Sequence, residues 1–91
     1  MAETNVIQVR YWAAAKSAAG TASDDFPVNE PVTLAALREE AVRRHPGTNL
    51  AAVLAVCSAV VGDQPVSSAD PGSVVVAPGS TVEFLPPFAG G

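Results

Sequence analysis

A chain of 91 residues is long enough for one hydrophobic core and too short to divide into two domains. Hydrophobic residues make up 48% of it and charged residues 15%, which excludes the depleted composition of disordered chains. The formal net charge is −4 and the basic residues gather only on one short helical segment, so we expect no nucleic-acid partner.

The N-terminal residues have neither the basic region nor the apolar run of a secretory signal. The longest apolar stretch, residues 50–61, is shorter than the roughly 20 residues that cross a bilayer. The single cysteine, Cys57, excludes an internal disulfide. We therefore expect a cytoplasmic protein that has no membrane partner.

The first part of the chain predicts a strand, a short helix and a second strand. Residues 6–12 alternate between apolar and polar side chains, with Ile7, Val9 and Tyr11 on the apolar side, as in a half-buried strand. An alanine-rich helix over residues 13–19 is expected to end at Gly20, because glycine is the preferred residue just after a helix. Residues 21–28 form a weaker strand pattern.

A main helix is predicted next. Thr33 is a suitable N-cap, and Leu34, Leu37 and Ala41 fall on one helical face, while residues 45–47 (HPG) end the helix.

The exposed side of this helix predicts two ion pairs. Glu39 with Arg43 and Glu40 with Arg44 have the i,i+4 spacing that brings side chains together on a helix.

The second half of the chain predicts a short helix, three strands and two turns. The helix covers 50–56, the strands cover 58–61, 74–76 and 81–85, and the turns cover 62–65 and 78–80. In the last strand Val82 and Phe84 share one face. The order of elements predicts an α+β fold, with a mixed sheet of about four to five strands and one main helix packed across it.

The end of the chain carries the clearest functional signal. Residues 84–91 read FLPPFAGG, and Pro86 and Pro87 favour an extended course. We therefore expect residues 1–85 to form the domain and residues 86–91 to form a projecting tail.

The two final glycines suggest what the tail is for. Gly90 and Gly91 place no side chain beside the terminal carboxylate, so they can enter a channel too narrow for a Cβ atom. A carboxylate is a poor electrophile at neutral pH and must be activated, for example as an acyl-adenylate, before it accepts a nucleophile. The ending therefore predicts a terminus that another protein's active site works on, and not an enzyme with its own side-chain active site.

Nearly the whole chain resembles the small subunit of molybdopterin synthase, a family of ubiquitin-like sulfur carriers with the β-grasp fold. The resemblance begins with the first strand and its alanine-rich helix (6–20), continues through the start of the main helix (32–37) and ends on residues 82–91. A strand that runs directly into two prolines, two further residues and two glycines is typical of the molybdopterin branch. Thiamine-type sulfur carriers, which are relatives, usually lack the paired prolines.

The resemblance implies a role in molybdenum cofactor biosynthesis. A ubiquitin-activating-type adenylyltransferase would use ATP to adenylate Gly91, and the product would become a thiocarboxylate whose sulfur passes to cyclic pyranopterin monophosphate. The large subunit of molybdopterin synthase, in a heterotetramer with this chain, would hold the pterin and supply the catalytic side chains. The resemblance implies no cofactor and no metal bound to this chain.

The resemblance also defines the expected site residues. Gly91 is the thiocarboxylate and acyl-adenylate site, with Gly90 beside it. The expected partner-binding residues are Phe84, Pro86, Pro87, Phe88 and Ala89. Of the two phenylalanines we favour Phe88 as the aromatic anchor, because it lies outside the alternating strand.

The other chemically capable side chains have simpler interpretations. We expect Cys57 to be a small buried hydrophobe and His45 to cap the main helix. The remaining assignments are a solvated helix lysine for Lys16, a solvated edge or turn for Asp24 and Asp25, and core or rim aromatics for Trp12 and Phe26.

Three other functions stay open at this stage. The chain could carry sulfur for thiazole or cysteine synthesis, or it could be a ubiquitin-like modifier attached to lysines through Gly91. It could also be a binding module with an inert tail, because a fold alone does not fix a function. A [2Fe-2S] ferredoxin on the same fold is excluded, because one cysteine cannot supply four thiolate ligands.

Overall fold

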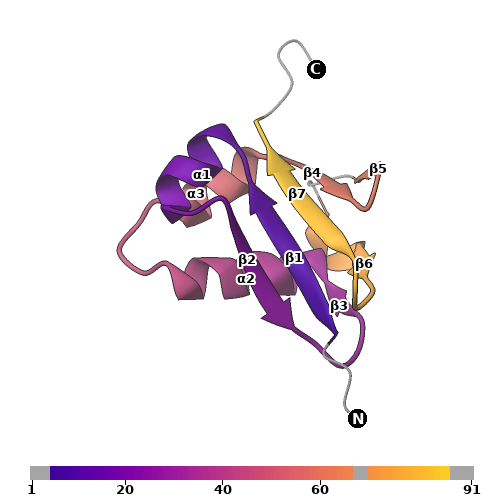
Figure 1. The fold of residues 1–91 in the computed structure, drawn as a ribbon. Coiled ribbons are helices and arrows are strands. Elements are labelled where there is room, and N and C mark those ends of the chain that lie inside the picture. The colour runs from indigo at the N-terminus through magenta and orange to yellow at the C-terminus, as the bar shows by residue number, and fades with distance from the viewer. Residues whose placement is uncertain (1–4, 67–69, 87–91) are drawn as a thin grey trace.

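The centre of the fold is a mixed sheet whose middle strand is the last one in the sequence. The computed structural model describes residues 5–66 and 70–86. The five strands lie in the order β2-β1-β7-β4-β5, where β1 and β7 are parallel and the other pairs antiparallel (Figure 1). Their bounds are Val6–Tyr11 (β1), Ser23–Pro27 (β2), Ser58–Val61 (β4), Gln64–Val66 (β5) and Thr81–Leu85 (β7).

Two very short strands form a second, separate sheet. Strand β3 (Val32–Thr33) pairs antiparallel with β6 (Val75–Val76), and the 3₁₀ turn Pro71–Ser73 precedes β6. This small sheet lies at the end of the molecule opposite to the end of β7 (Figure 1).

The three helices begin and end where the local sequence predicts. They are α1 (Ala13–Ala19), α2 (Leu34–Arg44) and α3 (Leu50–Val56). Gly20 follows α1 with φ of 75°, a left-handed conformation that glycine adopts without a Cβ clash. The Thr33 hydroxyl accepts a hydrogen bond from the backbone N–H of Ala36 at 3.1 Å, which confirms Thr33 as the N-cap of α2.

The helices cover one face of the sheet and leave the other face open. Ile7, Val9 and Tyr11 of β1 and Val82 and Phe84 of β7 are buried, whereas the residues between them are exposed or half-buried. The helices complete the core with Ala15 and Ala19 from α1, Leu34, Leu37 and Ala41 from α2, and Leu50 and Leu54 from α3. The α+β prediction, with α2 as the main helix, is confirmed.

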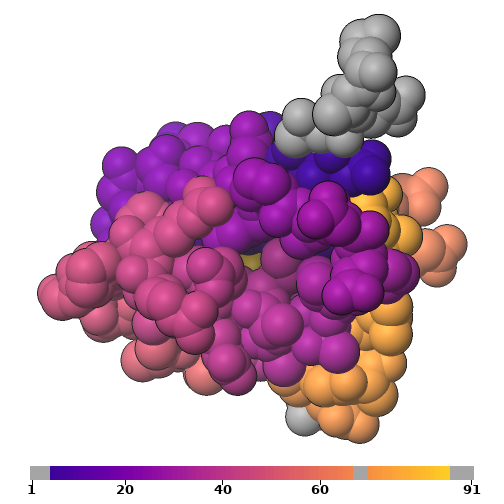
Figure 2. Space-filling view, turned by 90° about the horizontal axis from the view of Figure 1, so that it is seen from below, coloured from indigo at the N-terminus to yellow at the C-terminus, as the bar shows by residue number. Residues whose placement is uncertain are grey.

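The connection between α2 and α3 forms one end of the molecule, away from the small β3–β6 sheet (Figures 1 and 2). Helix α2 ends at Arg44, and His45 is its C-cap residue, with its backbone N–H bonded to the Val42 carbonyl at 3.1 Å. The predicted end of the main helix at residues 45–47 is therefore confirmed.

Two local predictions are wrong. The turn expected over 62–65 contains only Gly62 and Asp63, because Gln64 already pairs with Val61 in the β4–β5 hairpin. A two-residue loop is the tightest hairpin connection, and Gly62 provides the positive φ (65°) that it needs.

The two i,i+4 ion pairs predicted on α2 are also absent. Arg43 instead contacts Glu40 at 2.6 Å with i,i+3 spacing. Arg44 turns toward β2, where its guanidinium lies 4.1 Å from the ring centroid of Phe26 and 3.9 Å from a carboxylate oxygen of Asp24. Contacts with the neighbouring strand thus replace a pairing that an isolated helix would favour.

Candidate functional site

Two of the predicted site residues, Phe84 and Pro86, lie in the part of the chain that the structure describes, and the others lie outside it. Phe84 is 1% exposed and belongs to the core, so its ring is not offered to a partner. Pro86 is exposed and follows β7 directly. The other five predicted residues, Pro87, Phe88, Ala89, Gly90 and Gly91, lie outside the described residues, as does most of the predicted tail over 86–91. Their roles stay predictions.

Because β7 is the central strand, its last residue lies at the middle of one edge of the sheet, between the end of β1 and the start of β4. Tyr11, the last residue of β1, is in register with Phe84, and the backbone N–H of Trp12 donates to the Phe84 carbonyl at 3.1 Å. On the other side of β7, Ser58 at the start of β4 is in register with Leu85. The end of β1, which leads into α1, and the start of β4, which follows α3, therefore lie on either side of the end of β7 (Figure 1).

Trp12 is an exposed aromatic residue held by two neighbours on the open face of the sheet. It is 40% exposed, and its indole Nε1–H donates to Glu83 Oε2 at 3.2 Å. The Arg10 guanidinium lies 5.4 Å from the ring centroid of Trp12, within the range of a cation–π contact. Trp12 is thus a rim aromatic, whereas Phe26, at 2% exposure, is a core aromatic.

The thiol of Cys57 is poorly suited to carry sulfur. Cys57 is 3% exposed, as expected for a small buried hydrophobe. Burial raises the pKa of the thiol above its ordinary value, and the positive charge of Arg38 offsets this only in part. Reactive cysteines have lowered pKa values and accessible sulfur atoms, so the location of Cys57 favours a structural role.

A polar cluster joins the end of α2 to the edge of the sheet. The Tyr11 hydroxyl donates to Asp24 Oδ2 at 2.9 Å, and His45 Nε2 lies 2.6 Å from the same oxygen. The side chains of Asp24 and His45 are each 17% exposed. The expectation of a solvated edge or turn therefore holds for the exposed Asp25 but is wrong for Asp24. The sequence gives no signal for this contact, because the two residues are 21 positions apart.

The Tyr11 hydroxyl is expected to stay protonated in the folded protein well above its ordinary pKa of about 10. Burial first, and then the hydrogen bond to the Asp24 carboxylate, raise the pKa of Tyr11. Below about pH 10 the hydroxyl is protonated in both states, so the stabilisation from its buried, hydrogen-bonded form is complete. Above about pH 10 it ionises in the unfolded chain but not in the folded one, so the free energy of unfolding falls as the pH rises.

An alkaline titration followed by phenolate absorbance measures this directly, because Tyr11 is the single tyrosine. The phenolate should appear together with unfolding. In Asp24→Asn the pKa should fall only partway, since burial is the larger cause. Ionisation of the folded protein at the ordinary pKa would contradict the described burial.

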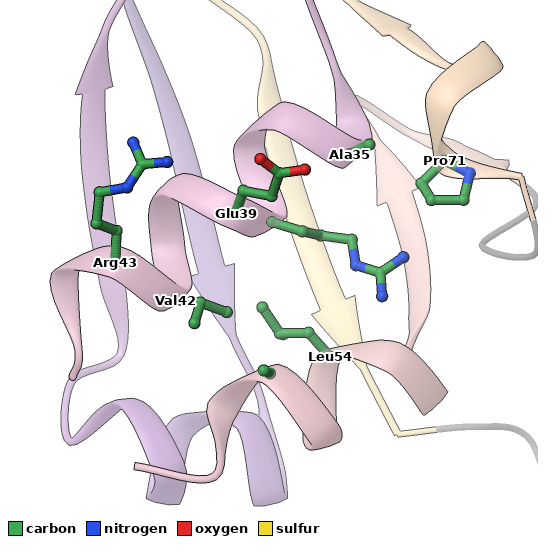
Figure 3. Close-up of a pocket in the computed structure, with 8 residues that line it drawn as sticks. Ala35, Glu39, Val42, Arg43, Leu54 and Pro71 are labelled. Atoms are coloured by element: carbon green, nitrogen blue, oxygen red, sulfur yellow. The ribbon is translucent and has the colours of Figure 1, made fainter. Parts of the chain in front are cut away.

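An open groove of about 480 Å³ lies between α2 and α3, on the helical side of the molecule (Figure 3). Val42 of α2 and Leu54 of α3 face each other across it, and Pro71 lies at one end (Figure 3). Among the described residues that line the groove, Glu39 is the one carboxylate, and there is no histidine or cysteine. The groove therefore lacks the paired acids, bases and nucleophiles of a hydrolytic or metal-dependent site.

Within residues 5–66 and 70–86, no three His, Cys, Asp or Glu side chains cluster as metal ligands would. In the same part of the chain, no helix has the length and apolar character needed to span a membrane.

The sheet topology and the position of β7 define the class of protein to which the chain belongs. A mixed sheet with a parallel first and last strand and a main helix across one face is the β-grasp fold of ubiquitin-like proteins. The chain belongs to the ThiS family, whose model matches residues 9–91. A comparison with curated protein sequences finds no match.

Several solved structures share this fold. The putative molybdopterin converting factor subunit 1 from Pyrococcus furiosus has a TM-score of 0.71 and 19% identity, covering 93% of this chain and 100% of its own. The small archaeal modifier protein 1 from H. volcanii has a TM-score of 0.73 and 14% identity, covering 92% and 99%. Urm1 from Trypanosoma brucei has a TM-score of 0.72 and 18% identity, covering 100% of both chains. The family and these neighbours show that the chain has the ubiquitin-like fold that sulfur carriers and protein modifiers share.

Proposed function

We propose that this chain is the sulfur-carrying small subunit of a molybdopterin synthase and works in the cytoplasm. The observation that carries the proposal is the place where β7 ends, a few residues before the two glycines in the sequence. The central strand β7 ends at Leu85, and the exposed Pro86 leads from there to Gly90 and Gly91. The carboxylate of Gly91 is thereby attached to the central strand of the sheet by a short segment.

The chemistry at Gly91 follows from that attachment. An activating enzyme joins the Gly91 carboxylate to the adenylate of ATP and releases pyrophosphate. A sulfur donor then displaces AMP and leaves a thiocarboxylate, whose sulfur goes to cyclic pyranopterin monophosphate held by the large synthase subunit. The paired prolines, Pro86 and Pro87, favour the molybdopterin branch over thiamine-type carriers. The chain itself positions the Gly91 carboxylate. The partner proteins supply the catalytic groups, and the activating enzyme uses ATP.

The proposal is tested by intact-mass and top-down mass spectrometry of native protein purified without reductant. We expect a fraction of molecules in which one oxygen of the Gly91 carboxylate is replaced by sulfur. This fraction should rise when the activating enzyme, ATP and a sulfur donor are supplied, and fall when the large subunit and cyclic pyranopterin monophosphate are added. Sulfur found only on Cys57, or nowhere, would overturn the proposal.

A second candidate is a ubiquitin-like protein modifier. The observation that favours it is the likeness to a solved structure described as a small archaeal modifier protein, with a TM-score as high as that of the molybdopterin converting factor. A modifier leaves Gly-Gly remnants on the lysines of other proteins after proteolysis, whereas a carrier does not. Proteomic detection of such remnants, lost when Gly90 and Gly91 are removed, would favour this alternative.

A further inference from the structure

The groove between α2 and α3 combines an apolar lining with a basic side chain. The residues that line it are Ala35, Arg38, Glu39, Val42, Arg43, Ala51, Leu54 and Pro71. Figure 3 shows the charged ends of Glu39 and Arg43 pointing away from Leu54. Arg43 also pairs with Glu40 at 2.6 Å. Arg38 is therefore the charge that a group bound in the groove would meet.

Arg38 is half-buried and has no carboxylate partner in the part of the chain that the structure describes. The ion pairs of that part involve Arg43, Arg44 and His45 instead. The positive charge of Arg38 acts on the pKa of the buried Cys57 thiol, so the guanidinium lies near the interior. A partly desolvated guanidinium without a counter-ion favours an anion, and a carboxylate matches its planar set of donors.

The last residues of the chain carry the matching chemistry. Residues 87–91 read PFAGG, so one large apolar side chain, Phe88, precedes the Gly91 carboxylate by three residues. An extended chain places these two residues at most about 11 Å apart. In the groove, Val42 lies one helical turn from Arg38, about 6 Å along α2, and the long Arg38 side chain adds its own reach. The two spacings are therefore compatible.

We propose that residues 87–91 of one copy dock in the α2–α3 groove of a second copy. Phe88 fills the space between the apolar side chains of the two helices, and the Gly91 carboxylate binds the Arg38 guanidinium. The groove, at about 480 Å³, is within the size range of pockets that hold small ligands, so it has room for an aromatic ring. Because the last two residues are glycines, no side chain keeps the carboxylate away from the guanidinium.

A second copy supplies the tail because Pro86 and Pro87 favour an extended course, which directs a chain's own tail away from its domain. Docking between copies follows mass action, so it occurs in concentrated protein and is lost on dilution. A docked Gly91 is covered, and any protein that needs the terminus must compete with the groove for it. The inference goes beyond the proposed sulfur chemistry and does not depend on it, since a carboxylate and a thiocarboxylate are both anions.

Amide chemical shifts of the ¹⁵N-labelled full-length protein, followed by NMR over a dilution series, test the contact. We expect the shifts of Val42, Ala51 and Leu54 to change with concentration, while those of Gln8, exposed on the open face of the sheet, stay constant.

Two arginine variants separate the docked charge from charge on α2 in general. Arg38→Gln should weaken the self-association by about tenfold, because it removes a charge-assisted hydrogen bond. Arg43→Gln is the matched control, since Arg43 lies on the same helix and already pairs with Glu40, and it should leave the self-association unchanged.

A mixture of two variants tests whether the contact is between copies. Phe88→Ala impairs the tail and keeps the groove, whereas Arg38→Gln impairs the groove and keeps the tail. ¹⁵N-labelled Phe88→Ala should therefore regain the groove shifts when unlabelled Arg38→Gln is added. No recovery in the mixture would overturn the inference. Groove shifts of the unaltered protein that stay constant on dilution would also overturn it.

Thermal melts accompany each variant. If Arg38→Gln is unfolded, a full-length chain with a carboxamide at Gly91 takes its place, because it removes the charge of the tail and leaves the domain unaltered. Equal self-association of the carboxamide and carboxylate forms, or of Arg38→Gln and Arg43→Gln, would overturn the inference. A terminus that docks in this way but never carries sulfur would overturn the proposed function alone.

Discussion

A chain that ends at Ala89 is expected to lose adenylation and sulfur transfer completely while melting at the same temperature as the full-length protein. The loss is complete because the carboxylate would then follow a residue with a Cβ atom and would sit two residues closer to the sheet. Stability should not change, because the buried core is built from residues between Ile7 and Phe84.

Thermal unfolding followed by circular dichroism, beside pyrophosphate release with the activating enzyme, measures the two effects. Gly90→Ala with Gly91→Ala is the matched control, because it keeps the length of the chain and adds only two Cβ atoms. This control should melt normally and react far more slowly than the unaltered protein. A truncated chain that unfolds at a clearly lower temperature would show that the last two residues pack into the fold.

The two phenylalanines near the end of the chain are expected to give opposite results. Phe84 is 1% exposed and central in β7, so Phe84→Ala should lower the free energy of unfolding by about 3–5 kcal/mol. Phe88→Ala should leave the melting curve nearly unchanged and weaken binding to the large synthase subunit by about 2 kcal/mol or more.

Thermal melts and isothermal titration against the large subunit separate these cases. Unchanged affinity for Phe88→Ala would remove Phe88 from the interface. A melt of Phe88→Ala that resembles that of Phe84→Ala would instead place Phe88 in the core.

Short-range patterns predicted most of the fold. The alternation of residues 6–12 identified the buried face of β1, and Gly20 and Thr33 marked helix ends through backbone requirements that act within a few residues. The same alternation places Trp12 on the polar side with Gln8 and Arg10, so its exposure could have been read from the sequence. The site at Gly91 was predicted from the glycine pair, the prolines and the family resemblance, and it stays a prediction because Gly91 lies outside the described residues.

Long-range contacts were not predictable in this way. The hydrogen bonds of Asp24 to Tyr11 and His45 connect two strands and a helix end, and they depend on how α2 crosses the sheet. The ion pairs expected on α2 failed for the same reason, because Arg44 finds Phe26 and Asp24 on a neighbouring strand. Neither Phe26 nor Asp24 belongs to α2, so the pattern of that helix alone could not predict the contacts of Arg44.

The central position of β7 has a consequence for how the protein is made. The strand between β1 and β4 is the last of the sheet to be synthesised, so β1 and β2 cannot join β4 and β5 until residue 85 is available. Pairing the first strand with the last also closes a loop of nearly the whole chain, which slows folding relative to folds built from local contacts. A growing chain is therefore expected to remain without its complete sheet until residue 85 has been added. Chains that stop before residue 85 could not fold into a carrier that partner proteins recognise. They would also expose apolar strands that favour aggregation.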